Sequence, residues 1–274
     1  MSKQNGVEDP DAGMDYLDRI RTAQSVNISS ELFEKLYLNP ESRVPGDLRK
    51  RFANPTPLPL LGFLIATGAL CPSLMGWRGA GGGGAANIGA YYFFGGLLQI
   101  FGAIFEWIIG NTFIYVVFGS YGAFWLAFAA TLTPAFNAEE AYLGAATTAA
   151  ERAAGLASFE ATLAFFLAFM GVLTFMYMVC AIRTNAVFFT IFVLLEIAFW
   201  LLTAGYWKAA SGDAAAFATL AKATGACLFA LDVLGFYLLF AQLLQAVDFP
   251  LDLPVGDLAH LVPSKTKLAK RKES

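Results

Sequence analysis

The chain has 274 residues, of which 57% are hydrophobic and only 14% are charged. Soluble domains are about 25% charged, so the composition excludes an ordinary soluble protein and indicates an all-α, polytopic membrane protein. The formal net charge of −3 argues against nucleic acid as a partner.

The first segment, residues 1–52, is polar and charged, and it lacks the early apolar run of a cleavable signal peptide. Inside it, apolar residues recur at helical spacing behind serines that can cap a helix: Leu32, Phe33, Leu36 and Tyr37. We expect a tail with one short amphipathic helix, Ser30 to Leu38, that lies on the membrane or on the protein itself. A regulatory docking element is the alternative.

The first apolar segment opens with three prolines. Residues 54–63 read NPTPLPLLGF, so prolines flank Thr56 and a third follows at Pro59. Proline has no amide donor and disfavours helix in the residue before it. At membrane depth, unpaired backbone is tolerated only inside protein or beside a watery cavity. We therefore expect a broken helix start that faces a pathway, with the Asn54 side chain available to a polar solute.

Six apolar runs reach the length of about 20 residues that a membrane-crossing helix needs. They cover about 58–76, 90–109, 113–133, 158–181, 186–206 and 223–246. A glycine-rich turn, two tight turns and two longer loops separate them: 79–87, 110–112, 183–185, 134–157 and 207–222. Glycine and alanine recur in the second and fourth runs, which predicts close helix contacts and an oligomer. The transmembrane bundle is thus expected over 53–248, followed by a basic tail over 249–274.

The basic residues predict the orientation of the bundle. With six spans, the side that holds both tails collects 14 of the 18 lysines and arginines. Because basic residues are enriched in cytoplasmic loops, both termini are predicted to be cytoplasmic. The sequon at Asn27 then stays unglycosylated, and the basic run Lys265–Lys272 meets anionic lipid.

Four carboxylates fall within the predicted spans: Glu106, Glu160, Glu196 and Asp232. A carboxylate at the centre of a span costs roughly 2.5–3.5 kcal/mol to insert. We therefore expect each of the four to have a structural or functional role that offsets this cost. Glu106 either braces the adjacent 110–112 turn or titrates. Glu160 is expected to offset the helix dipole at the start of the fourth span. Glu196 and Asp232 lie deepest, and either a structural role or a place on an aqueous pathway is open to them.

No lysine or arginine lies within the predicted spans, so an anion there must be held by hydroxyls, amides and helix N-termini. Suitable side chains are Asn54, Thr56, Thr67, Gln99, Asn111, Thr112, Ser120 and Tyr121. Tyr121 precedes a glycine, so it can project across a narrow lumen. An ordinary buried aromatic is the alternative.

No pattern of an enzyme, a metal site or a cofactor site is found. The single histidine, His260, lies in the tail, and the three cysteines are too far apart in sequence for a CxxC site. The glycine-rich 79–84 segment lacks the lysine and hydroxyl residues of a phosphate-binding loop. We expect a non-enzyme with no cofactor and no metal.

Several segments occur in the order of one family's motifs. They are NPTPLPL from Asn54, GGLLQ from Gly95, Glu106, GNTF from Gly110 and SYGAFW from Ser120. On these segments the chain resembles the acetate uptake transporter family, the SatP/YaaH-like six-helix proteins, over about residues 50–248. Thr56 and Pro59 depart from the family's NPAPLGL. The two tails resemble the fungal branch, whose members are named for acetate transport or ammonia export.

The resemblance implies a multi-pass plasma-membrane protein that transports acetate and other short monocarboxylates, in some members succinate. It implies a homo-hexamer with a separate pathway inside each protomer, gated by Phe63, Tyr121 and Leu195. In that pathway Tyr121 and Asn54 would meet the carboxylate, while Phe63 and Leu195 contact the methyl group. Without a fixed positive charge, binding is weak, as conduction requires.

The mechanism of transport stays open between several alternatives. Uptake of an anion against an inside-negative potential favours proton symport, with Glu106, Glu196 and Asp232 as candidate proton carriers. Passive conduction of the anion is the rival for the same pathway. A membrane sensor or signalling protein, with the N-terminal tail as its output, and a channel for water, ammonia or another small neutral solute are the other classes.

Overall fold

The structure, a computed structural model, describes residues 52–258 and 261–262. Within them, six helical segments are long and apolar enough to cross a membrane. Five are α4 (Pro57–Met75), α7 (Thr112–Leu132), α9 (Ala149–Ala181), α10 (Ala186–Ala210) and α11 (Ala214–Ala246). The second span is composite and runs through η2 (Gly82–Asn87), α5 (Ile88–Ala90), the π-helical η3 (Tyr91–Leu98) and α6 (Gln99–Ile108). The predicted all-α bundle of six spans is confirmed.

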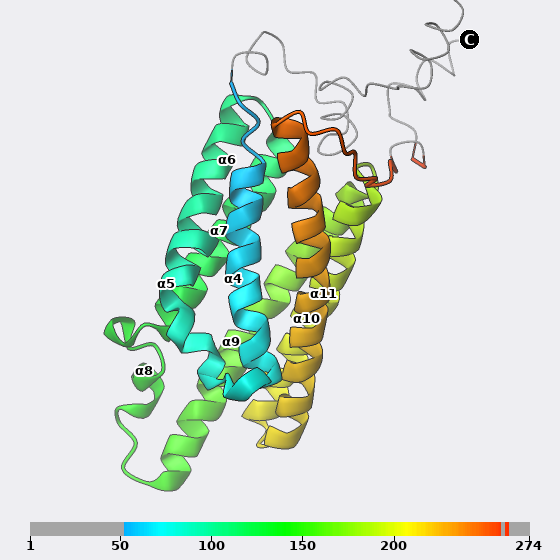
Figure 1. The fold of residues 1–274 in the computed structure, drawn as a ribbon. Coiled ribbons are helices and arrows are strands. Elements are labelled where there is room, and N and C mark those ends of the chain that lie inside the picture. Colours follow the sequence, from blue (N-terminus) through cyan, green and yellow to red (C-terminus); the bar gives the residue numbers. More distant parts are fainter. Residues whose placement is uncertain (1–51, 259–260, 263–274) are drawn as a thin grey trace, which may run out of the picture.

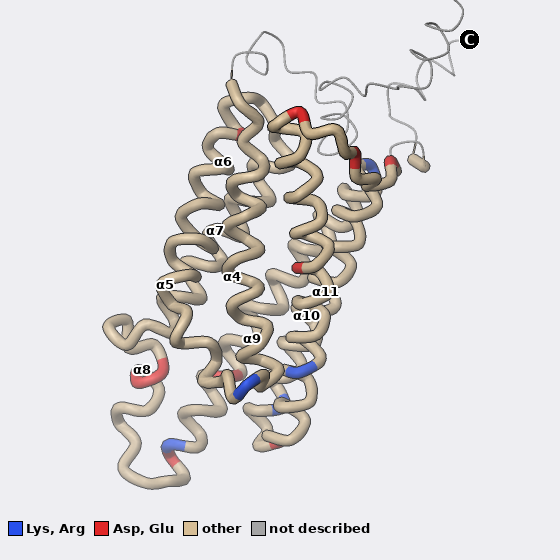
Figure 2. Tube along the Cα trace, in the orientation of Figure 1, with Lys and Arg blue, Asp and Glu red and all other residues tan. Residues whose placement is uncertain are grey.

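Three short helices lie in the connections: η1 (Trp77–Gly79), η4 (Pro134–Phe136) and α8 (Glu140–Leu143). The start of α4 and the end of α11 lie at the same end of the bundle, as an even number of spans requires (Figure 1). Most charged residues gather toward the two ends of the bundle (Figure 2). The cytoplasmic side of the termini stays a prediction. The predicted amphipathic helix, the sequon, His260 and the basic run lie outside the described residues.

The helices form two sets of three. The first three spans contact one another through α4, η3, α6 and α7, and the last three through α10, which packs against both α9 and α11. The α4 helix also packs along α11, so it joins the two sets (Figure 1). The buried core lies between these sets and includes side chains from α4, α7, α10 and α11.

The α4 helix begins regularly, and the predicted broken start is wrong. Thr56 is its N-cap, Pro57 is its first residue, and the Leu60 amide already donates to the Thr56 carbonyl at 3.3 Å. The first amides of any helix have no acceptor within it. Proline at 57 and 59 therefore removes donors that the helix does not use, and its fixed φ suits the first turn.

The helices α9 and α11 have 33 residues each and begin earlier than the predicted spans at 158 and 223. Their added turns are rich in alanine, a strong helix former that contributes little to a hydrophobic run. Thr148 and Glu151 form a capping box at the start of α9. Glu160 thus lies in the helix interior, and its predicted role at the helix start is wrong, because Glu151 occupies the first turn.

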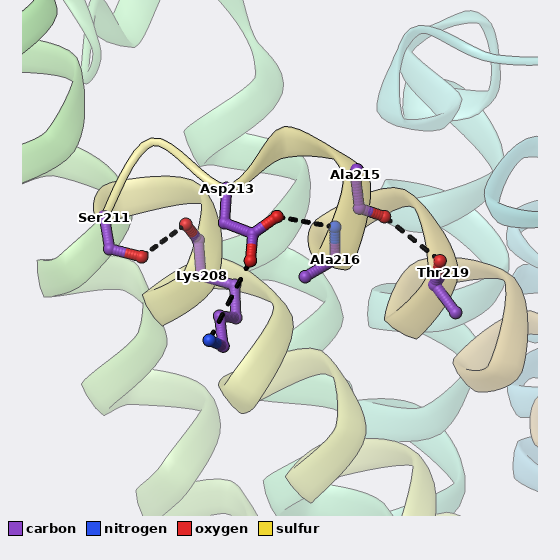
Figure 3. Close-up of polar contacts among 6 residues, drawn as sticks. All are labelled: Lys208, Ser211, Asp213, Ala215, Ala216 and Thr219. Carbon is purple, nitrogen blue, oxygen red and sulfur yellow. Dashed lines mark hydrogen bonds and ion pairs between the residues drawn. The ribbon is translucent and has the colours of Figure 1, made fainter.

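The connection between α10 and α11 is a tight turn at 211–213, not the predicted 207–222 loop (Figure 3). The Ser211 hydroxyl donates to the Lys208 carbonyl at 2.8 Å. Asp213 accepts from the Ala216 amide at 3.0 Å and lies 3.8 Å from the Lys208 ammonium. Asp213 therefore caps α11 directly after α10 ends.

The segment after α11 folds back over the start of α10. The Ala186 amide donates to the Gly256 carbonyl at 2.7 Å, and the Leu258 amide donates to the Thr184 carbonyl at 3.0 Å. Val255 is 4% exposed and belongs to the core cluster. The beginning of the predicted 249–274 tail is therefore part of the packed bundle.

Pro59 and Gly102 form a close contact between α4 and α6, and it generates the first prediction. A Cβ at Gly102 would overlap three atoms of the Pro59 ring, which cannot rotate away. We expect Gly102→Ala to lower the free energy of unfolding by about 1–3 kcal/mol through overpacking. Thermal unfolding in detergent measures the effect.

The controls for this prediction come from the same chain. Gly89→Ala meets nothing within 4 Å and should leave the unfolding midpoint nearly unchanged. Pro59→Gly in the Gly102→Ala background removes the overlapping ring and should recover stability. Equal midpoints for Gly102→Ala and Gly89→Ala would contradict the proposed contact.

Candidate functional site

Three residues that were predicted to form a gate lie together in the core. Phe63 of α4, Tyr121 of α7 and Leu195 of α10 are 7%, 3% and 5% exposed. The ring centroids of Phe63 and Tyr121 are 6.0 Å apart. All three residues line both of two small cavities between the helices. They therefore form a partition between these cavities.

The two cavities lie on opposite sides of Phe63 along α4. The larger, of about 40 Å³, extends toward the end of α4 and includes Thr67 and Thr224 in its wall. The smaller, of about 20 Å³, extends toward the start of α4, where Leu60 lines it. A single water needs about 10–15 Å³ measured in this way. Both cavities are thus narrow, and the partition separates them.

The walls of the cavities are almost entirely apolar. No charged residue lines either of them. The Thr67 hydroxyl donates to the Phe63 carbonyl at 2.9 Å, and the Thr224 hydroxyl donates to the Leu220 carbonyl at 2.9 Å. Both threonines have therefore used their one proton within their own helix, and their hydroxyls can offer a solute only acceptor lone pairs.

The Tyr121 hydroxyl is engaged with α9. It lies 2.9 Å from the Thr174 hydroxyl, while the Tyr121 ring lines the cavities. The preceding residue, Ser120, lies 3.0 Å from the Tyr177 hydroxyl. These two pairs join α7 of the first set of helices to α9 of the second. Ser120 itself does not appear in either cavity wall.

Glu106 is fully buried and lies in a polar cluster away from the cavities. Its carboxylate accepts hydrogen bonds from the Thr56 hydroxyl and, at 2.7 Å, from the Asn111 side-chain amide. The Asn111 backbone amide also donates to the Glu106 carbonyl at 2.8 Å. The cluster ties the start of α4 to the α6–α7 turn. These contacts match the bracing alternative for Glu106.

The remaining predicted polar residues of the pathway lie elsewhere. Asn54 is exposed at the end of the bundle and accepts from the Thr56 amide at 3.1 Å. Gln99 is buried, and its side-chain amide donates to the Gly95 carbonyl at 2.7 Å. Thr112 is exposed at the first position of α7. None of these three lines the two cavities.

The two deep carboxylates differ in their surroundings. Glu196 is half-buried and accepts from the Trp200 indole on its own helix at 2.6 Å. Asp232 is 4% exposed and faces α4, where a Cβ on Gly68 would lie 2.6 Å from its Oδ2. Pro72 lacks the amide that would donate to the Gly68 carbonyl in a regular helix. Asp232 thus packs against Gly68 near the place where Pro72 interrupts the hydrogen bonding of α4, and its Oδ1 is buried without a hydrogen-bond partner among the described residues.

Sequence reasoning did not single out Thr174, Tyr177 or Thr224. The available signal was a hydroxyl side chain inside an otherwise apolar run, as at Thr174 and Tyr177, which are three residues apart on one face of α9. Thr224 lies at the edge of the predicted sixth span. In the structure it lies in the interior of α11 and lines the larger cavity.

Comparison with known proteins gives a consistent result. The sequence profile of the GPR1/FUN34/yaaH family matches residues 37–260. "Protein alcS" of Aspergillus fumigatus is 50% identical over 237 residues, 86% of each chain. "Acetate transporter protein patA" of Aspergillus clavatus is 33% identical over 76% of this chain and 79% of its own. The solved structure of the bacterial acetate channel SatP matches with a TM-score of 0.56 and 28% identity, over 75% of this chain and 99% of that one.

The Glu106 cluster generates the second prediction. Glu106→Ala leaves the buried Thr56 hydroxyl and the Asn111 amide without this acceptor, and each such loss costs about 1–3 kcal/mol. We expect a lower unfolding midpoint in detergent and less folded protein. Glu140→Ala removes an exposed glutamate from α8 and serves as the control. Two variants of equal stability would show that the cluster is dispensable.

Proposed function

Because the chain belongs to the GPR1/FUN34/yaaH family, we propose that it transports acetate and other short monocarboxylates across a membrane, as a carrier or channel and not as an enzyme. The observation that supports this most directly is the pair of narrow apolar cavities that meet at Phe63, Tyr121 and Leu195. The similarity to a bacterial acetate channel and to an acetate transporter protein points to the same solute.

The chemistry of the cavities suits a small carboxylate. Acetate combines one methyl group, which an apolar wall accommodates, with one carboxylate, which needs hydrogen-bond donors. Phe63 and Leu195 supply apolar contact. Tyr121, which lines both cavities, and Trp125, which lines the larger one, carry hydrogen-bond donors. Asn54, exposed at the end of the bundle, would meet the carboxylate only at the entrance. Since the walls carry no charge, the solute would bind weakly and leave readily.

Proton symport is the mechanism that we favour, with Asp232 as the first of the three candidate carriers. A proton on Asp232 would neutralise a charge that is costly at membrane depth. Asp232 Oδ1 is buried without a hydrogen-bond partner among the described residues, so no contact seen there would be lost when the group is protonated. Thr67, next to Gly68, lines the larger cavity, so a change at Asp232 would reach the pathway through α4. Glu196 and Glu106 already accept hydrogen bonds and are weaker candidates.

Assembly and location belong to the same proposal. The outer faces of α6 and α9 carry large exposed apolar side chains, among them Trp107 at 65% and Phe169 at 72%. Such surfaces need lipid or neighbouring subunits to cover them, which supports a place in a membrane. The family resemblance is the reason to propose a homo-hexamer and the plasma membrane in particular. Both cavities lie between helices of one chain, so each protomer would have its own pathway. Succinate is a further candidate substrate.

Labelled acetate uptake into proteoliposomes tests the function. We expect uptake above that of protein-free vesicles, and faster uptake when the outside is more acidic than the inside, because protons would then drive the solute inward. Uptake that follows the acetate gradient and ignores the pH gradient would indicate the passive channel. No uptake at all would overturn the proposal and favour the sensor or the channel for a neutral solute.

The proton carrier is tested by Asp232→Asn, which keeps the shape of the side chain but cannot exchange a proton near neutral pH. We expect the pH gradient to lose most of its effect on acetate uptake, while uptake down an acetate gradient persists. Glu196→Gln is the matched variant and should keep the response. A full response to the pH gradient in Asp232→Asn would remove Asp232 from the mechanism.

A further inference from the structure

The two hydroxyl pairs between α7 and α9 have a defined direction. A hydroxyl group has one proton to donate. The Thr174 hydroxyl lies 2.7 Å from the Met170 carbonyl, which can only accept, so the Thr174 proton is used there. Tyr121 must then be the donor in its 2.9 Å contact with Thr174. The Tyr121 proton is therefore directed at α9 and not into the cavities that its ring lines.

The second pair runs in the opposite sense. The Ser120 hydroxyl donates to the Val117 carbonyl at 2.9 Å, so Tyr177 is the donor to Ser120 at 3.0 Å. Each helix thus provides one tyrosine that donates to a hydroxyl on the other. The two rings meet edge to face, with centroids 5.9 Å apart. The Ser120–Tyr177 pair keeps α7 joined to α9 even when Tyr121 releases Thr174.

The direction of the Tyr121 hydrogen bond determines whether a carboxylate solute can bind to this hydroxyl. A carboxylate only accepts hydrogen bonds, so it cannot bind a tyrosine hydroxyl whose single proton is already directed elsewhere. Thr174 is 0% exposed and Tyr121 is 3% exposed, so water does not offer an easy substitute. A hydrogen bond to an ionised carboxylate is roughly twice as strong as one between neutral groups. A carboxylate in the cavity is therefore a better acceptor for Tyr121 than Thr174.

We infer that Thr174 is a positioning residue that holds Tyr121 across the closed pathway, and that an arriving carboxylate replaces Thr174 as the acceptor of the Tyr121 hydroxyl. The inference rests on the proposed transport of monocarboxylates and adds the residue that sets the closed state. The partition then opens in response to a hydrogen-bond acceptor, and an apolar solute of the same size leaves it shut. Thr174 contributes to selectivity without being in either cavity wall.

The test uses Thr174→Val in full-length protein in proteoliposomes. Valine keeps the shape of threonine but cannot accept the Tyr121 proton, so the closed arrangement is destabilised and a larger fraction of the protein is ready to bind. Since apparent affinity scales with the binding-ready fraction, we expect the half-saturating acetate concentration to fall by a factor of about 3–10. Thr174→Ser restores the acceptor and should behave like the wild type.

Two further variants separate this role from a structural one. Thr162→Val removes a hydroxyl of α9 that donates only to the Ser158 carbonyl, and it should leave half-saturation unchanged. In a Tyr121→Phe background there is no phenolic proton to hold, so Thr174→Val should produce no further change. If Thr174→Val does not fold, Thr174→Cys, a weaker acceptor, is expected to lower half-saturation by a smaller factor.

The outcomes distinguish the two levels of the proposal. Wild-type protein that moves no acetate overturns the proposed function and this inference together. Wild-type uptake with unchanged half-saturation in folded Thr174→Val overturns the inference alone. A fall in half-saturation that persists unreduced in the Tyr121→Phe background also overturns it, because the effect would then not pass through the Tyr121 hydroxyl.

Discussion

The two hydrogen bonds on which the rest of the bundle depends join the Glu106 carboxylate to Thr56 and to Asn111. Buried polar groups have to find partners within the protein, and this cluster does so for the N-cap of α4, a residue of α6 and the turn before α7. The Glu106 cluster sets the position of α4 along its axis relative to α6. In this position the Pro59 ring packs against Gly102. One turn further along α4, the same register brings Phe63 to Tyr121. The geometry of the partition is thus determined by contacts that lie outside the cavities.

The division of the bundle into two sets of helices explains where a pathway can form. Within each set the helices pack directly, whereas both cavities lie between α4 and α7 on one side and α10 on the other, and α11 also lines the larger cavity. Across this boundary the helices are joined by α4 packing on α11 and by the hydroxyl pairs between α7 and α9. The proposed pathway therefore lies at the boundary where the two sets of helices meet.

Hydropathy alone predicted the six spans and both tight turns, because each span is a long apolar run and each turn interrupts it with polar residues or glycine. The ends of the helices were less predictable. Alanine-rich turns extend α9 and α11 beyond their apolar runs. The prolines at the start of α4 predict a break in a helix interior, but in the first turn they remove donors that the helix does not use.

The residues of the candidate site were also only partly predictable from the sequence. Phe63, Tyr121 and Leu195 come from three spans that no periodicity connects, so their proximity could be anticipated only from the family resemblance. Their place within apolar runs predicts that Glu106 and Asp232 cost free energy to insert into a membrane. It does not predict which of the two carboxylates has hydrogen-bond donors beside it. The pairing of Tyr121 with Thr174 depends on the rotation of α7 against α9, and sequence spacing does not encode that rotation.

The contact between Pro59 and Gly102 also couples two positions that lie far apart in the sequence. The proline ring occupies the volume that any side chain at position 102 would need. A side chain at position 102 therefore destabilises the bundle while proline stands at position 59, and a smaller residue at position 59 lowers that cost. The effect of a substitution on one helix thus depends on the residue present on the other, which is epistasis between α4 and α6.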